Sequence, residues 1–431
     1  MDPRKVFSYD STYIPPVYNG RKKKLIRHPT PVRTRVVQEE VRSPERQKRT
    51  DVRQTEKPKT AKKSSGITVG CVIRRTLLVL FTILLLAVYS VLALCNTIAK
   101  GPSVTVRNLL VLSAMQASAT KWAPGLFLDK ETVDQIVSDS EVISTDVISL
   151  EEYQKNLQTN VSGDGDPISG ADEWANAKDG MRLDIISGST YKAYVLLVKD
   201  PSRVYVGTSS DYKSGKMGIR IFDIAARDNA VAAINGGEFY DVGGQGTGDN
   251  PIGLTYSRGA CVWNDGYRRT FIGFDSENRM IVTEKMTKAE ADALGVRDAV
   301  SFQTGNVLID HDGDNLHLYY ADSNTGTAQR TAIGQRADGA VILLVTDGRT
   351  ASSLGATHND VIDIMVSYGA VSAAMLDGGS SAMMYYEDYY TKYSIDTSTL
   401  DQYQLRGLVN KYKAFTNPRR IPTYFLVAKE G

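Results

Sequence analysis

Residues 340–347 read AVILLVTD and residues 371–379 read VSAAMLDGG, and these two apolar runs decide the fold. A helix is predicted between them, over residues 359–368, with Thr357 as N-cap and Asp360 three residues later. Strands joined through a helix are parallel when they lie in one sheet. The runs lack polar and apolar alternation, which is typical of a sheet covered on both faces. We therefore expect Asp347 and Asp377 at the same edge of a covered sheet.

A third apolar run ends in the same way. Residues 230–234 read AVAAI and are followed by Asn235 and two glycines. If this run joins the same sheet in the same direction, Asn235 lies on one rim with Asp347 and Asp377, beyond the strand ends where ligands bind. The alternative is that Asn-Gly and Asp-Gly are only turn dipeptides. Three apolar runs that end alike favour the shared rim.

Glycines accompany these polar residues, and arginines lie close to them in the sequence. Glycine lets a backbone approach a ligand closely and lets successive N–H groups surround an anion. Arginine holds phosphate through two parallel hydrogen bonds. Phosphate is therefore the expected occupant of the rim, and the candidate binding residues are Asn235, Gly236, Gly237, Gly378, Gly379, Arg330 and Arg349.

The charge of the chain is divided among three segments. Residues 1–75 hold 20 Lys and Arg against 7 Asp and Glu, residues 76–95 hold no charge, and residues 96–431 hold 31 against 42. A basic tail, an apolar stretch and an acidic bulk argue against an ordinary soluble cytosolic protein. Of 3 cysteines only Cys261 lies in the acidic bulk, which argues against a disulfide scaffold or a cysteine-based zinc module.

The uncharged stretch is predicted to be a transmembrane helix. Residues 76–95 read TLLVLFTILLLAVYSVLALC, and a helix of this length crosses a hydrocarbon core of about 30 Å. A cleaved signal peptide has a shorter apolar core and a shorter basic region, so we expect an uncleaved anchor. Arg74 and Arg75 precede the stretch, and the positive-inside rule then places the N-terminus in the cytoplasm. Residues 96–431 are expected outside the cell membrane.

Four segments follow from these patterns. Residues 1–75 are predicted to be a disordered basic cytoplasmic tail; an arm that binds nucleic acid or anionic lipid is the alternative, but the composition shows no nucleic-acid-binding pattern. Residues 76–95 are the transmembrane helix that contacts the lipid bilayer, and residues 96–171 are a juxtamembrane helical stalk and linker. Residues 172–431 are the outer domain, predicted to be α+β or mixed α/β with a mixed, strand-rich sheet.

The outer domain resembles the phosphodiester glycosidase family. The resemblance rests on six motifs in order: INGGEFYD (234–241), NPIG (250–253), QTGNVLID (303–310), QRTAIG (329–334), TDGR (346–349) and MLDGGSSAMMYY (375–386). An anchor followed by a stalk is similar to the members found in Gram-positive bacteria that are described as exopolysaccharide- or cell-wall-related.

This resemblance implies a hydrolase that cleaves a sugar-1-phosphodiester at the anomeric C–O bond and leaves a phosphomonoester. It implies Asp377 and Asp347 as the catalytic carboxylates, with the roles of base and nucleophile unassigned. The implied substrate is a phosphodiester-linked glycan or wall polymer. Two residues depart from the family pattern. Glu238 is either an additional catalytic acid or a peripheral residue, and Ser380, which replaces a common glycine, either offers a hydroxyl to phosphate or has no role.

No cofactor or metal is expected, and calcium stays open as an alternative. Residues 310–315 read DHDGDN, but position 12 of this would-be calcium loop is Ala321, so we expect a hairpin turn. Two alternatives to an enzyme also stay open: a non-catalytic module that binds anionic wall polymer, and a scaffold for envelope assembly. The sequence identifies neither the sugar nor the polymer, and it does not predict the oligomeric state.

Overall fold

The structure is a computed structural model. It describes residues 69–115, 120–140, 143–159, 174, 177–209, 212, 218–241, 248, 250–321, 325–348, 350, 353–412 and 417–430. Residues 1–68 of the predicted tail, the predicted boundary at Ala171, and Arg349 lie outside the described residues.

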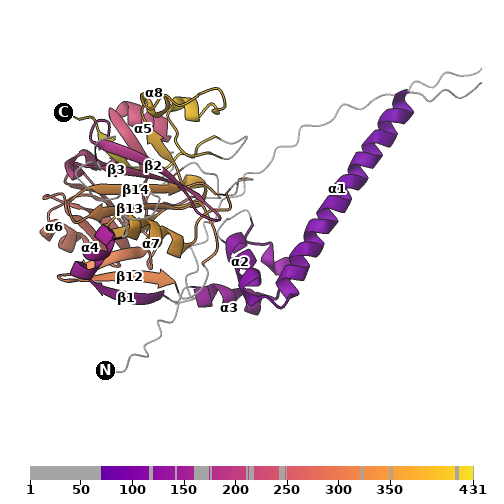
Figure 1. Cartoon of the computed structure of the whole chain (residues 1–431), viewed down its shortest axis with the longest axis horizontal. Helices are drawn as coiled ribbons and strands as arrows, with labels where there is room; N and C mark the ends of the chain where they lie inside the picture. The colour runs from indigo at the N-terminus through magenta and orange to yellow at the C-terminus, as the bar shows by residue number, and fades with distance from the viewer. Residues whose placement is uncertain are drawn as a thin grey trace, which may run out of the picture. The chain divides into compact units, whose positions relative to one another are not determined.

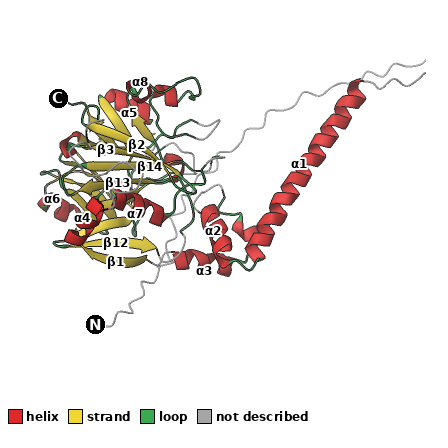
Figure 2. Cartoon of the chain, viewed as in Figure 1, coloured by secondary structure: helices red, strands yellow, loops and turns green. Residues whose placement is uncertain are grey.

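In the described part of the chain the strands, yellow in Figure 2, form three sheets. Neighbouring strands in each sheet are antiparallel. The 8-stranded sheet has the order β1 (Ile143–Ser149), β12 (Asn315–Ala321), β11 (Val307–Asp312), β15 (Ala370–Leu376), β13 (Thr331–Arg336), β14 (Val341–Thr346), β3 (Lys192–Val198), β2 (Met181–Ser187). The 5-stranded sheet has the order β7 (Ala260–Asn264), β6 (Leu254–Ser257), β10 (Val296–Phe302), β8 (Thr270–Asp275), β9 (Met280–Thr283). The 4-stranded sheet has the order β16 (Met384–Tyr386), β5 (Ala230–Asn235), β17 (Thr423–Ala428), β4 (Val204–Thr208).

Short helices connect these strands (Figure 1). The α-helices after the first strand are α4 (Leu150–Thr159), α5 (Ile221–Arg227), α6 (Lys288–Ala293), α7 (His358–Ser367) and α8 (Tyr389–Lys392), and the 3-10 turns in the same part are η3 (Pro201–Arg203), η5 (Gly379–Ser381) and η6 (Gln404–Arg406). Helix α7 begins with the predicted capping box, since Thr357 and Asp360 bond each other's backbone N–H groups. The mixture of helices and strand-rich sheets confirms the predicted fold class.

Strands β14 and β15 run in the same direction, as the sequence predicts, although they are not neighbours. Both pair antiparallel with β13, which lies between them. Thr331 at the start of β13 pairs with Val345 and with Leu376. The ends of β14 and β15 therefore flank the start of β13, and this rim of the sheet carries Asp347, Arg330 and Asp377.

Strand β5 corrects the expectation that the third apolar run joins this sheet. It lies in the 4-stranded sheet between β16 and β17. Its side chains are buried on both faces, which a central strand of either sheet would require, so the apolar pattern does not distinguish the two positions.

The central strands β13, β14 and β15 of the 8-stranded sheet are buried on both faces, as predicted, whereas the edge strand β1 has no buried side chain. One core cluster combines its residues Val345 and Leu376 with Ile234 and Phe425 of the 4-stranded sheet. A second cluster places α7 against the opposite face, where Ile362 is fully buried. Each such fully buried side chain contributes about 1.5–3 kcal/mol of transfer free energy.

The sheet also extends further toward the N-terminus than the predicted boundary. Strand β1 pairs with β12 along its whole length. In the following helix, Tyr153 is buried, and its hydroxyl donates to the carbonyl oxygens of Val366 at 3.1 Å and Ala370 at 2.9 Å. Residues 143–159, which the sequence analysis assigns to the stalk and linker, are thus structural parts of the outer domain.

The first helix, α1 (Val69–Lys100), contains the predicted span of residues 76–95. It is long and apolar enough to cross a membrane, a property that signal sequences share. Two further helices, α2 (Val104–Met115) and α3 (Lys130–Ser140), follow it, with the 3-10 turn η1 (Pro124–Leu126) between them. These helices pack on each other through Val111, Leu112, Val133 and Ile136.

Candidate functional site

Asn235, the last residue of β5, connects the 4-stranded sheet to the rim of the 8-stranded sheet. Its Nδ2 donates to the carbonyl oxygen of Asp377 at 2.5 Å. Its Oδ1 accepts from Thr331 Oγ1 at 2.8 Å and from the Met383 N–H at 3.1 Å. A fully buried amide that both donates and accepts suits asparagine, because aspartate lacks the N–H donor. Asn235 therefore meets Asp377 as predicted, but from a neighbouring sheet and as a structural link.

Asp377 follows β15 and is only partly exposed. Burial raises the pKa of its carboxyl to about 6, against the opposing effects of a hydrogen bond from Ser381 and the positive charge of Arg419. The negative charge of Glu238 raises the pKa further. A carboxyl with a pKa near neutrality can accept or donate a proton under physiological conditions.

Arg419 is the basic residue of this site that the sequence analysis missed. Its Nη1 donates to Ser381 Oγ at 3.1 Å, and its Nη2 forms an ion pair with Asp241. The guanidinium also lies over the ring of Phe239, 5.2 Å from the ring centroid. Arg419 lies in a loop before β17 and not at the end of an apolar run, so the pattern of strand ends did not indicate it.

Glu238 is the second carboxylate close to Asp377. Its Oε1 accepts from Gln303 Nε2 at 2.6 Å. Burial raises the pKa of Glu238, and the bond from Gln303 and the charges of Arg269 and Lys121 oppose this effect. The preceding Gly237 is required for close packing, since a Cβ there would lie 2.2 Å from the Ser301 carbonyl oxygen.

Asp347 lies at the same rim, but it is more deeply buried than Asp377. It is only 3% exposed, and both carboxylate oxygens accept hydrogen bonds, from Tyr194 Oη at 2.9 Å and from the Lys411 N–H at 2.9 Å. Burial raises its pKa, while these bonds lower it. Because one strand separates β14 from β15, the backbones that carry Asp347 and Asp377 are about 10 Å apart.

The remaining predicted phosphate ligands are partly engaged within the protein. Arg330 donates through Nε to the Ala356 carbonyl and through Nη2 to the Gly326 carbonyl, each at 3.2 Å. The Gly236 N–H donates to Thr423 O and the Gly379 N–H to Gln329 O, each at 2.9 Å.

The neighbouring glycine and serine also pack within the protein. A Cβ on Gly378 would lie 2.7 Å from Gln329 O, so this glycine permits close packing. Ser380 lies in η5, where its carbonyl oxygen accepts from Tyr412 Oη at 2.7 Å.

No group of three or more His, Cys, Asp and Glu side chains among the described residues could hold a metal ion. The acidic segment at residues 310–315 is the β11–β12 hairpin, as expected. In it Asp310 accepts hydrogen bonds from Tyr319 and pairs with His317.

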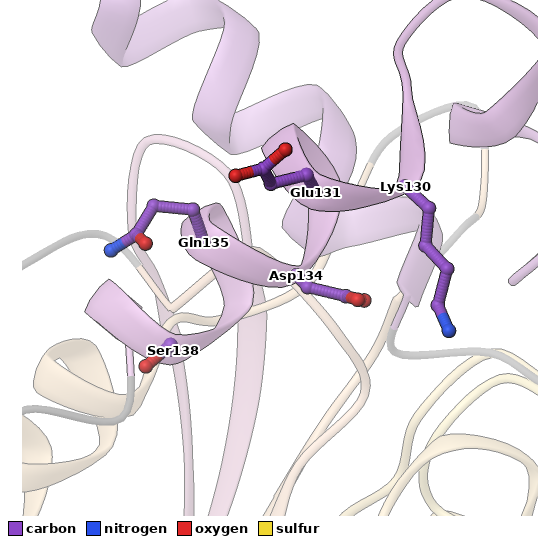
Figure 3. A pocket seen from close by; sticks show the side chains of 5 residues that line it. All are labelled: Lys130, Glu131, Asp134, Gln135 and Ser138. Atoms are coloured by element: carbon purple, nitrogen blue, oxygen red, sulfur yellow. The ribbon is translucent and has the colours of Figure 1, made fainter.

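A surface pocket lies elsewhere, on α3 (Figure 3). Its lining residues are Lys130, Glu131, Asp134, Gln135 and Ser138. All five come from one helix, and their side chains extend along it without pointing at a common position (Figure 3). A site that orients a ligand needs polar groups that converge, so the rim around Asp377 is the better candidate.

The segment that contains the rim matches a known family. Residues 228–428 match the family model described as phosphodiester glycosidase. This match confirms, over residues 228–428, the resemblance seen in the motifs.

A curated relative has no assigned activity in its name. It is the SPbeta prophage-derived uncharacterized protein YomE of Bacillus subtilis (strain 168), 28% identical over 200 residues. The match covers 44% of this chain and 28% of the relative, so this chain corresponds to less than a third of that protein.

Solved structures with some similarity include the catalytic domain of zebrafish N-acetylglucosamine-1-phosphodiester alpha-N-acetylglucosaminidase. It is 17% identical, with a TM-score of 0.43, over 59% of this chain and 85% of that one. A hypothetical protein from Synechocystis is 14% identical, with a TM-score of 0.40, over 58% of this chain and 63% of that one.

Proposed function

We propose that this protein hydrolyses a sugar-1-phosphodiester linkage in a glycan, with Asp377 and Glu238 as the reacting carboxylates. The observation that carries the proposal is the pair itself: two partly buried carboxyls with raised pKa values beside the guanidinium of Arg419, where the negative charge of Glu238 raises the pKa of Asp377. The pair lies within the segment that matches the phosphodiester glycosidase family. Paired carboxyls of this kind divide the roles of acid and base.

The chemistry follows from these groups. The bond between the anomeric carbon and the phosphate oxygen breaks, water adds its oxygen to the anomeric carbon, and one carboxylate takes the proton that water loses. The products are the free sugar and a phosphomonoester. Phosphate leaves with little need for protonation, so a positive charge beside it stabilises the transition state. The bonds to Ser381 and Asp241 use two of the five N–H donors of Arg419, which leaves donors for phosphate.

Asp347 takes a supporting role in this proposal. Its two carboxylate oxygens are occupied by Tyr194 and by the backbone of Lys411. It therefore acts as a positioning residue that fixes the chain around residue 411 against the rim. Arg330, and Arg349 as the sequence suggests, are proposed as additional cationic groups for the phosphate side of the substrate.

We also propose that α1 anchors the protein in the cell membrane, with the N-terminus in the cytoplasm and the catalytic domain outside. Leu77, Phe81 and Leu86 on α1 are each more than half exposed, and an extended apolar surface of this kind suits a lipid environment. The substrate would then be a phosphodiester-linked glycan of the cell wall or an exopolysaccharide.

The test uses the full-length protein in detergent micelles and methyl phosphodiesters of glucose, galactose, N-acetylglucosamine and N-acetylgalactosamine, each linked through C1. Release of free sugar is measured by chromatography for the wild type and for Asp377→Asn. The proposal predicts release from at least one diester and its loss in Asp377→Asn, whereas Asp312→Asn in the exposed β11–β12 hairpin retains activity. Binding of the diesters without release would instead indicate a non-catalytic module.

A further inference from the structure

Two buried side-chain atoms at this site lack a hydrogen-bond partner, one on an acidic residue and one on a basic residue. They are Glu238 Oε2 and Arg269 Nε, and neither has a partner among the residues that the structure describes. The charge of Arg269 lowers the pKa of Glu238, so the two groups influence each other. No ion pair joins them in the described part of the chain. Buried polar atoms are normally satisfied, so an unpaired donor and an unpaired acceptor indicate a place for a ligand group.

The chemistry of the two atoms selects that group. A hydroxyl can accept from Arg269 Nε and donate to Glu238 Oε2 at the same time. A phosphate oxygen only accepts, and the Glu238 carboxylate repels it. The position beside Glu238 therefore suits a neutral, hydroxyl-bearing part of the substrate.

Two exposed tyrosines lie close to these residues in the sequence, Tyr240 after Glu238 and Tyr267 before Arg269. Tyr240 is 42% exposed and Tyr267 is 55% exposed. Asp265 links both residues, because one of its carboxylate oxygens accepts from Tyr240 Oη at 3.4 Å and the other accepts from the Tyr267 backbone N–H at 2.9 Å. The Arg269 guanidinium lies over the Tyr267 ring, 5.5 Å from the centroid. The Tyr240 hydroxyl and the Tyr267 backbone are thus bonded to one carboxylate, and the Tyr267 ring packs against Arg269.

Gly253 keeps this arrangement compact. It has a positive φ of 64°, and its N–H donates to the same Asp265 carboxylate at 2.8 Å. A Cβ at this position would lie 3.0 Å from Arg269 Cγ and 2.6 Å from Ser301. A larger residue would clash with Ser301 and also press on the Arg269 side chain, which explains the glycine of the NPIG motif by packing.

We infer that Glu238, Arg269, Tyr240 and Tyr267 form a subsite for the sugar ring of the substrate. A pyranose has apolar C–H faces that pack on aromatic rings and hydroxyls at its edge that bond to charged groups. The inference rests on the proposed function. It also predicts the orientation of the bound substrate, with the sugar near Arg269 and the phosphate near Arg419.

The test measures the binding of a glycoside and of phosphate separately. Binding of methyl α-glucoside, methyl N-acetyl-α-glucosaminide and inorganic phosphate to the full-length protein in detergent is followed by ligand-observed NMR. We expect Tyr267→Ala and Arg269→Met to raise the Kd of at least one glycoside about tenfold and to leave the Kd for phosphate unchanged. Tyr240→Ala is expected to act in the same direction. Tyr267→Phe retains the ring and should bind the glycoside normally.

Arg258→Met is the matched control. Arg258 lies over the Tyr205 ring at 5.1 Å, so it has the same kind of stacking, but it lies at the far end of β6 from Gly253. It should change neither Kd. The inference is overturned if no glycoside binds the wild type, or if the Tyr267 and Arg269 variants lose phosphate and glycoside equally or lose neither. Glycoside binding that depends on these residues, without hydrolysis of any diester, would retain the subsite and reject only the proposed function.

Discussion

Arg419 donates a hydrogen bond from Nη1 to Ser381 Oγ at 3.1 Å, and Ser381 in turn bonds the Asp377 carboxyl. The hydroxyl of Ser381 is fully buried. The guanidinium and the carboxyl are therefore held near each other without forming a direct ion pair. This arrangement keeps a positive charge beside a carboxyl whose pKa is still raised.

Arg419→Ala should lower kcat by about 100-fold, because it removes the charge that stabilises the departing phosphate. Steady-state kinetics with the best methyl phosphodiester measure this effect. Arg420→Ala is the matched control, because the neighbouring Arg420 donates to the Gly218 carbonyl at 3.4 Å instead. Equal losses in the two variants would contradict the role of Arg419.

Asp377→Asn should stabilise the protein at neutral pH while it abolishes activity. The folded pKa of Asp377 is about 6, above the ordinary value of 3.8, so the folded state binds this proton more tightly than the unfolded state. Stability from this group is complete below pH 3.8 and is lost as the pH rises through 6. The Tm of Asp377→Asn should exceed that of the wild type above this range and approach it at about pH 4.

Asp396→Asn provides a control of opposite sign. Hydrogen bonds from the backbone and side chain of Ser398 lower the pKa of the exposed Asp396. Its contribution is present above the ordinary pKa and is lost as the pH falls, so this substitution should not raise the Tm at neutral pH. A Tm for Asp377→Asn below that of the wild type at neutral pH would contradict the raised pKa.

Asp347→Ala should destabilise the fold by about 1–3 kcal/mol, because it leaves the buried Tyr194 hydroxyl and Lys411 N–H without their acceptor. Urea denaturation measures this change. Asp347→Asn keeps one acceptor and should retain more activity than Asp377→Asn. If Asp347→Asn is completely inactive and its stability is unchanged, Asp347 is a catalytic residue, as the family resemblance implies.

A fragment that begins at residue 172 should be less stable than one that begins at residue 143. The shorter fragment lacks β1, which pairs with β12, and Tyr153, which is buried in the core. Loss of a buried aromatic side chain alone costs about 3–5 kcal/mol. Thermal unfolding of the two fragments compares them, and equal Tm values would place the boundary where the sequence analysis expects it.

The sequence predicts those parts of the fold that local pattern determines. The apolar runs that end at Asp347 and Asp377, the capping box at Thr357 and the long apolar helix are all read from neighbouring residues. The sheet to which β5 belongs depends on pairing with β17, almost 200 residues later, and its uniformly apolar pattern suits both sheets.

The candidate site was predicted only in part for the same reason. Asn235 and Asp377 stand at strand ends, where the sequence marks them. Arg419 bonds to Ser381 from a loop that no sequence pattern distinguishes. Arg269 influences Glu238 from a distant segment, and its side chain packs near Gly253. Glu238 was named as a departure from the family pattern, but its burial and its influence on Asp377 depend on contacts between distant segments.

The central claim is that water attacks the anomeric carbon of a sugar-1-phosphodiester at Asp377 and Glu238. Hydrolysis of the best methyl phosphodiester in H₂¹⁸O, followed by mass spectrometry of both products, tests it most directly. The account predicts ¹⁸O in the released sugar, none in the phosphomonoester, and no labelled sugar from Asp377→Asn. Label in the phosphate product would mean that the P–O bond breaks, and it would contradict the account.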